Sequence, residues 1–333
     1  SVAIVVLNNN GGSISFEDAL TVTSSLSVGV NKTFSLSFDA NAGGQSSSIA
    51  GTTVLGNTGT LTLGNDPADS ITFSGGVTAT APSGVSIAGT LNSSNASISL
   101  GATNLIASTT IDTGAGMGNV VFASTLNGAQ NLTISAGTGT ITFVGAVGGS
   151  TPIGTGTGAA LTINSGVTEF QSALQTASGI SIIPDVTFRD TVTLGGGTAT
   201  TLNGNVTLDG LSFSAGRSIT FGDAGVDTVT LSGGAVTITT TANNGSILFN
   251  GAVSGAQNLS ISTNGAGTVT CNGDVTVGAT VASALSVSSA SLSLGINVDI
   301  NTSAVNGNIS LSIDGLALGG TNTVNTGAGS FQI

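Results

Sequence analysis

Residues 118–143 read GNVVFASTLNGAQNLTISAGTGTITF, and residues 245–271 repeat the pattern as GSILFNGAVSGAQNLSISTNGAGTVTC. Runs such as Thr140–Phe143 alternate apolar residues with Ser or Thr, which is the period-two pattern of a strand with one buried face. Gly or Asn follows most runs, and both residues supply turns because they adopt backbone conformations with positive φ. The repeat therefore predicts short strands separated by tight turns.

The same alternation extends over most of the chain. A weaker repeat matches residues 69–76 with residues 227–234. Residues 326–331 resemble residues 113–116, which come just before the first copy of the long repeat. Only Thr168–Gln175, which carries Glu and Gln, suggests a short helix, and the alternative is a further strand with Gln on its outer face. Further alternating runs lie at Ser35–Phe38, Thr60–Leu63, Ser97–Leu100, Ser218–Phe221 and Ser310–Ile313.

Short strands, abundant turns and few helix-forming residues predict an all-β chain that winds as a β-solenoid. Val, Ile, Leu and Phe would face inward, and Ser, Thr and Asn outward. With roughly 20 to 25 residues per coil, residues 1–333 would form about 15 coils of a single elongated rod, with atypical terminal coils at 1–30 and 314–333. The alternative is tandem β-sandwich domains, which need Pro-rich linkers, whereas the four Pro residues here are scattered.

The composition excludes several classes of function. The chain has 15 acidic and three basic residues, a net charge of −12, no His, Trp or Tyr, and one Cys. A His-based catalytic triad, a His-ligated metal, a thiolate zinc cluster and an internal disulfide cannot be built from these residues. Three basic residues do not form a nucleic-acid footprint. No apolar run approaches the length of a membrane-spanning helix.

The phrase GAQNL at Gly128–Leu132 and again at Gly255–Leu259, with its flanking Thr-x-Thr-Phe strands, resembles repeats of filamentous-haemagglutinin-like adhesins and other giant exported bacterial β-solenoid proteins. The resemblance implies a right-handed parallel β-helix that is secreted or held at the cell surface. It implies a role in adhesion, matrix or fibres. It transfers no functional residues, because the shared motifs are structural.

Two pairs of acidic residues are candidate cation ligands. Asp66 and Asp69 lie in NDPAD, Asp223 and Asp227 lie in GDAGVD, and each pair precedes a predicted strand. Ca²⁺ binds carboxylate and carbonyl oxygens, so these four Asp residues would contribute to Ca²⁺ sites. The alternative is that their side chains cap turns, in which case the chain needs no cofactor.

One mixed cluster, Asp185, Arg189 and Asp190, is the best candidate for catalysis. Asp185 and Arg189 are four residues apart, so on a strand they face the same side and predict a surface ion pair. A carbohydrate-active groove needs clustered acids, and such grooves usually also offer Trp or Tyr for sugar stacking. The sequence therefore predicts a protein that is not an enzyme. Cys271 occupies the position of Phe143 in the repeat, which predicts a small buried apolar residue.

Both ends of the chain are apolar, whereas solenoids usually carry polar caps. Val2, Ile4, Val6, Phe331 and Ile333 are therefore candidates for self-assembly by strand addition. The chain begins at Ser1 without Met, which predicts either a processed mature form or a fragment of a longer protein, and both fit export.

Few charges and few cleavage sites for trypsin-like proteases suit a durable protein outside the cell. The sequence thus predicts a non-catalytic extracellular subunit of a cell-surface filament, fibre or surface layer that forms a homo-polymer. The alternative is an adhesin stalk or binding module that recognises a cell-surface ligand.

Overall fold

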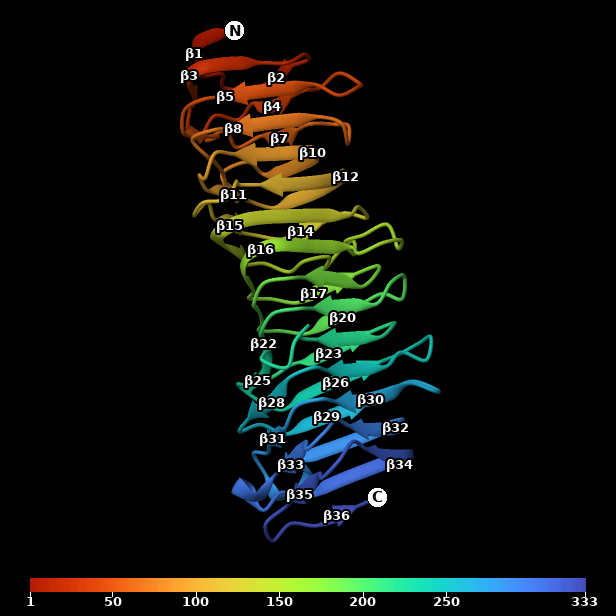
Figure 1. The fold of residues 1–333 in the computed structure, drawn as a ribbon. Coiled ribbons are helices and arrows are strands. Elements are labelled where there is room, and N and C mark those ends of the chain that lie inside the picture. Colours follow the sequence, from red (N-terminus) through yellow and green to blue (C-terminus); the bar gives the residue numbers. More distant parts are fainter. The chain divides into compact units, whose positions relative to one another are not determined.

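The computed structural model describes residues 1–333 and is an all-β chain whose strands stack in parallel as a β-solenoid of about 14 turns (Figure 1). This confirms the predicted fold class. The β-sandwich alternative is wrong, because successive coils pair in parallel and a sandwich pairs its strands in antiparallel. By contacts the chain forms two compact units, residues 1–155 with 160–171, and residues 156–159 with 172–333.

In the first unit, each coil contributes strand segments to three parallel ladders. The first ladder contains β2 (Ser13–Phe16), β4 (Ser35–Phe38), β7 (Thr60–Leu63), the starts of β10 (Gly84–Ser93) and β12 (Thr103–Asp112), and β14 (Leu126–Asn127). The second contains the start of β3 (Thr21–Val28), β5 (Ser46–Ile49), β8 (Ser70–Phe73), the ends of β10 and β12, and the starts of β15 (Leu132–Phe143) and β16 (Leu161–Phe170). The third contains β1 (Val2–Leu7), the end of β3, β6 (Thr53–Val54), β9 (Val77–Ala79), β11 (Ile98–Leu100), β13 (Val120–Phe122) and the ends of β15 and β16.

The second unit repeats this arrangement and adds two short 3₁₀ turns, η1 (Val281–Ser283) and η2 (Ser303–Val305). One ladder contains β17 (Leu174–Thr176), β20 (Val192–Leu194), β23 (Ser212–Ala215), β26 (Val236–Thr240), β29 (Leu259–Ser262), the starts of β32 (Leu285–Leu294) and β34 (Ile309–Leu318), and β36 (Phe331–Gln332). Another contains β18 (Ile180–Ile182), β21 (Thr200–Leu202), β24 (Ile219–Phe221), β27 (Ile247–Phe249), β30 (Thr268–Cys271) and the ends of β32 and β34. The last contains β19 (Val186–Phe188), β22 (Val206–Asp209), β25 (Thr228–Ser232), β28 (Ala252–Gly255), β31 (Val275–Val277), β33 (Asp299–Asn301) and β35 (Thr323–Asn325).

The core consists of inward side chains that stack on equivalent residues of the next coil. The ring of Phe143 stacks on Phe122 and Phe170 with centroid separations of 5.1 and 4.5 Å, and all three side chains are buried. Ser and Thr between the inward residues point outward, as the period-two pattern predicts. Parallel pairing in register therefore turns the alternation of each strand into continuous apolar columns.

A buried Thr closes the same corner in both copies of the long repeat. Thr113 donates its hydroxyl to the carbonyl oxygen of Gly118 at 2.8 Å, and Thr240 does the same to Gly245 at 2.6 Å. The echo at the end of the chain has a shorter form of this contact, since the half-buried Thr326 donates to the carbonyl oxygen of Gly329, three residues ahead, at 2.9 Å. The hydroxyl satisfies a carbonyl group that the turn removes from the ladder.

Asn residues link these corners from coil to coil. Asn95, Asn244 and Asn306 have φ values of 60°, 50° and 49°, a left-handed conformation that Asn tolerates better than most residues. Their side-chain oxygens accept main-chain N–H groups of the following coil, from Gly116 to Asn95, from Ala266 to Asn244 and from Ala328 to Asn306.

The segment Thr168–Gln175 is not a helix. Its first residues belong to strand β16, which ends at Phe170, and strand β17 begins at Leu174. Gln171 and Gln175 are exposed, as the strand alternative predicts. Gln and Glu are good helix formers, but helix propensity is worth only a few tenths of a kcal/mol per residue, and burial of the alternating apolar residues outweighs it.

The Phe column predicts a large cost for truncation. We expect Phe143→Ala to lower the free energy of unfolding by about 3 to 5 kcal/mol, because it removes the middle ring of a buried stack. Urea denaturation followed by circular dichroism measures the change. Val144→Ala is the control, since Val144 is 42% exposed. Equal losses in the two variants would contradict the assignment of Phe143 to the core.

Candidate functional site

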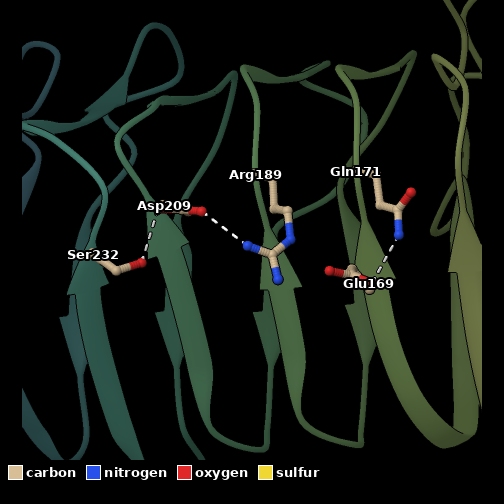
Figure 2. Close-up of polar contacts among 5 residues, drawn as sticks. All are labelled: Glu169, Gln171, Arg189, Asp209 and Ser232. Atoms are coloured by element: carbon tan, nitrogen blue, oxygen red, sulfur yellow. Dashed lines mark hydrogen bonds and ion pairs between the residues drawn. The ribbon is translucent and has the colours of Figure 1, made fainter.

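A short polar ladder crosses three coils of the second unit (Figure 2). Arg189 Nη1 donates to Asp209 Oδ2 at 3.0 Å, and Ser232 Oγ donates to Asp209 Oδ1 at 3.0 Å. Asp209 and Ser232 end strands β22 and β25 and are direct neighbours in their ladder. The Arg189 and Asp209 side chains are 49% and 25% exposed, so solvent screens the ion pair, which contributes about 1 kcal/mol or less.

The predicted ion pair between Asp185 and Arg189 is wrong. Asp185 Oδ1 instead accepts the main-chain N–H of Asn205 at 2.9 Å and its side-chain Nδ2 at 3.1 Å. Strand β19 lies between Asp185 and Arg189, so four extended residues, about 13 Å, separate them, whereas the next coil is about 4.8 Å away. The third member of the cluster, Asp190, accepts the main-chain N–H of Thr191 at 2.6 Å. These residues do not form a common site.

In the first unit, Glu169 and Gln171 make a separate polar contact at the end of β16 (Figure 2). Gln171 Nε2 donates to Glu169 Oε2 at 3.0 Å on the exposed face of the coil. The two residues are two apart in extended chain, which places their side chains on the same side.

The first acidic turn is built around Asp69. Its Oδ2 accepts the main-chain N–H groups of Asn65 and Asp66 at 2.7 and 2.9 Å, and its Oδ1 accepts that of Gln45 at 2.9 Å. Asp66 Oδ1 accepts the N–H of Ala68 at 2.9 Å. Asp69 is only 1% exposed. Both carboxylates therefore accept main-chain N–H groups and cap the turn, as the sequence analysis allowed.

The second acidic turn has the same geometry. Asp227 Oδ2 accepts the N–H groups of Asp223 and Ala224 at 3.0 and 2.9 Å, while the Asp223 carboxylate is exposed and makes no hydrogen bond. Gly64 and Gly222 open the two turns with φ values of 72° and 75°, which favour glycine. No group of three or more His, Cys, Asp or Glu residues gathers in the structure.

At the N-terminal coil, the self-assembly candidates point in two directions. Val2, Ile4 and Val6 are 44%, 63% and 68% exposed. Val2 pairs with buried Val22, but Ile4 and Val6 pair with Ser25 and Ser27, which face outward. Two of the three candidates therefore lie on the outer face of the ladder. The residues of β1 that continue the core are Val5 and Leu7, which the sequence analysis did not select.

At the C-terminal coil, inward residues lie open to solvent. Leu316, Leu318, Val324 and Phe331 are 40–57% exposed, although Leu292, Leu294, Ile300 and Ile309, their partners in register, are buried. With Leu311 and Asn322 the open residues line a cavity of about 190 Å³. Phe331 was selected from the sequence, and Ile333 lies just beyond the last strand and is 66% exposed. The alternation of Leu316 and Leu318 in β34 is the signal that would have added both residues.

Comparisons with known proteins return no similarity that names a family. No family model, curated protein or solved structure matches this chain. No helix in the structure has the length and hydropathy needed to span a membrane.

Cys271 is buried, as the repeat predicts. It lies between Phe249 and Leu294 in its ladder and is 3% exposed. Burial raises the pKa of the Cys271 thiol to about 12.

Because the thiolate is the reactive form, we expect the native protein to resist a thiol reagent such as DTNB at pH 8 and to react fully once unfolded. Rapid labelling of the native chain would contradict this burial.

The two acidic turns predict unequal effects of the same substitution. Asp69→Ala leaves three main-chain N–H groups without their acceptor in a buried turn, so we expect a loss of about 3 kcal/mol or more in unfolding free energy. Asp227→Ala removes two bonds in a more exposed turn and should cost less. Chemical denaturation of both variants measures the difference, and a larger loss in Asp227→Ala would contradict it.

Proposed function

We propose that this chain is a non-catalytic extracellular structural protein that builds a filament, fibre or surface layer by contacts between terminal coils. The observation that supports this most directly is the pairing of the outermost strands. β1 pairs only with β3, and β36 pairs only with β34. Within residues 1–333 no strand pairs with the outer edge of either, and such edges of main-chain N–H and C=O groups bind further strands.

The exposed apolar residues supply the driving force for this association. Leu316, Leu318 and Val324 point toward the core side of their coil but remain partly open. Complete burial of a large apolar side chain contributes about 1.5 to 3 kcal/mol. Association loses translational and rotational freedom, so several such residues must be buried together. The C-terminal coil offers them in one place.

Charge does not oppose the contact. Residues 2–16 and 315–333 contain no charged side chain. The nearest charged side chain at the C-terminal coil is Asp314, which is exposed in β34, so few charges oppose the contact although the chain as a whole has a net charge of −12.

The basic residues support a durable role outside the cell. Lys32 Nζ donates to Asn10 Oδ1 at 2.8 Å, and Arg217 Nε donates to the carbonyl oxygen of Gly196 at 2.6 Å. With Arg189 they are the chain's three basic residues. A trypsin-like protease thus finds few cleavage sites, and the strands between them are held in ladders that resist local opening.

Assembly is tested with variants of the C-terminal coil. We expect the native chain to form fibres or sheets at rising concentration in negative-stain microscopy and sedimentation. The double variant Leu316→Asp/Leu318→Asp should stay monomeric, because it places two charges in the apolar contact. Val226→Asp is the control, since Val226 is 85% exposed in a turn of another coil. Monodisperse native particles that bind cells or glycans would contradict the proposal and favour an adhesin stalk.

A further inference from the structure

Asp39 is a buried carboxyl group with one oxygen left without a partner. It follows strand β4 with φ 54° and is fully buried. Its Oδ1 accepts a hydrogen bond from Ser47 Oγ at 2.6 Å. Its Oδ2 is closed to solvent and contacts no hydrogen-bond donor of the protein. A buried polar atom of this kind requires a group from outside the chain or carries an energetic penalty.

The carboxylate of Asp69 is near enough to interact electrostatically with that of Asp39. One segment donates to both acids, from the main-chain N–H of Gln45 to Asp69 and from the hydroxyl of Ser47 to Asp39. Burial raises the pKa of the Asp39 carboxyl, the hydrogen bond from Ser47 opposes that rise, and the negative charge of Asp69 adds to it. Two carboxyl groups therefore share one buried corner of adjacent coils.

No basic side chain neutralises this corner. Lys32, the only basic residue of the first unit, donates to Asn10 on the exposed surface. A proton on Asp39 Oδ2 would remove the charge but leave a buried O–H without an acceptor, because no partner lies within hydrogen-bond distance. A cation at Oδ2 would both neutralise the charge and coordinate the free oxygen.

We propose that Asp39 Oδ2 and the Asp69 carboxylate bind a metal cation of the Ca²⁺ class at this corner. Ca²⁺ combines carboxylate oxygens with main-chain carbonyls and water in flexible geometry, whereas Mg²⁺ demands a near-ideal octahedron. Residues 41–44, which include Gly43 and Gly44, are exposed, link Asp39 to Gln45 and offer main-chain carbonyl oxygens. The site differs from the pairs that the sequence suggested, since Asp66 takes no part in it.

The turn at Asp227 provides a matched control within the same protein. Asp227 accepts the same pair of turn N–H groups as Asp69 does. The strand pairing of Leu202 with Phe221 corresponds to that of Phe38 with Leu63. Asn203 therefore occupies the position of Asp39, so this turn has one carboxylate less in the coil before it.

The test uses the full chain, stripped with EDTA and titrated with CaCl₂ by isothermal calorimetry, with thermal unfolding in parallel. We expect Ca²⁺ to bind and to raise the unfolding temperature of the native protein, and Asp39→Asn to abolish both effects. Asn keeps the backbone conformation, as Asn31 and Asn95 adopt similar φ values. Asp227→Asn should keep the Ca²⁺ effect.

Three results would overturn the site. The first is no heat and no thermal shift at millimolar Ca²⁺ in the native chain. The second is unchanged Ca²⁺ binding in Asp39→Asn, which would place the ion elsewhere. The third is an equal shift with MgCl₂, which would indicate general screening of the net charge. None of these outcomes depends on whether the terminal coils assemble, so the cation site and the proposed filament are tested independently.

Discussion

The fold depends on parallel hydrogen bonding between equivalent strand segments of successive coils. In register, this pairing places each inward residue on an inward residue of the next coil, as with Phe122 and Phe143. The ladders thus satisfy the main chain and build the core in one step. Hydrogen bonds at the corners, such as those of Thr113 and Asn95, fix the turn so that the next strand begins in the same register.

Strand positions were predictable because they depend on local alternation. Thr140–Phe143 and Ser35–Phe38 were identified from the sequence, and both are strands with their apolar residues buried. Contacts between coils were not predictable in the same way, since they depend on coil length. Arg189 contacts Asp209 because this coil has 20 residues, the same offset that pairs Val186 with Val206. Asp185, the partner that the sequence suggested for Arg189, is near in the chain but distant along the strand.

The same limit applies to the candidate sites. Asp66 and Asp69 were predicted as a pair because they are three residues apart in the sequence. The acid that shares the corner of Asp69 is Asp39, which lies 30 residues before it. Isolated between Phe38 and Ala40, Asp39 gives no sequence signal of a site. At the terminal coils the apolar character was visible, but the register with Ser25 and Ser27 was needed to show that Ile4 and Val6 face outward.

The offset between paired residues also varies along the chain, from 18 residues between Leu174 and Val192 to 30 between Ser135 and Ser165, and small register shifts within a ladder absorb part of the difference. Longer coils carry their additional residues in the loops between strands. Since strand pairing joins each coil to its neighbours, an ancestral gene could gain or lose whole coils by duplication or deletion while the remaining strands keep the same kind of partner. Molecular length is then a quantity that evolution can adjust in steps of one strand spacing, independently of the chemistry displayed on the loops.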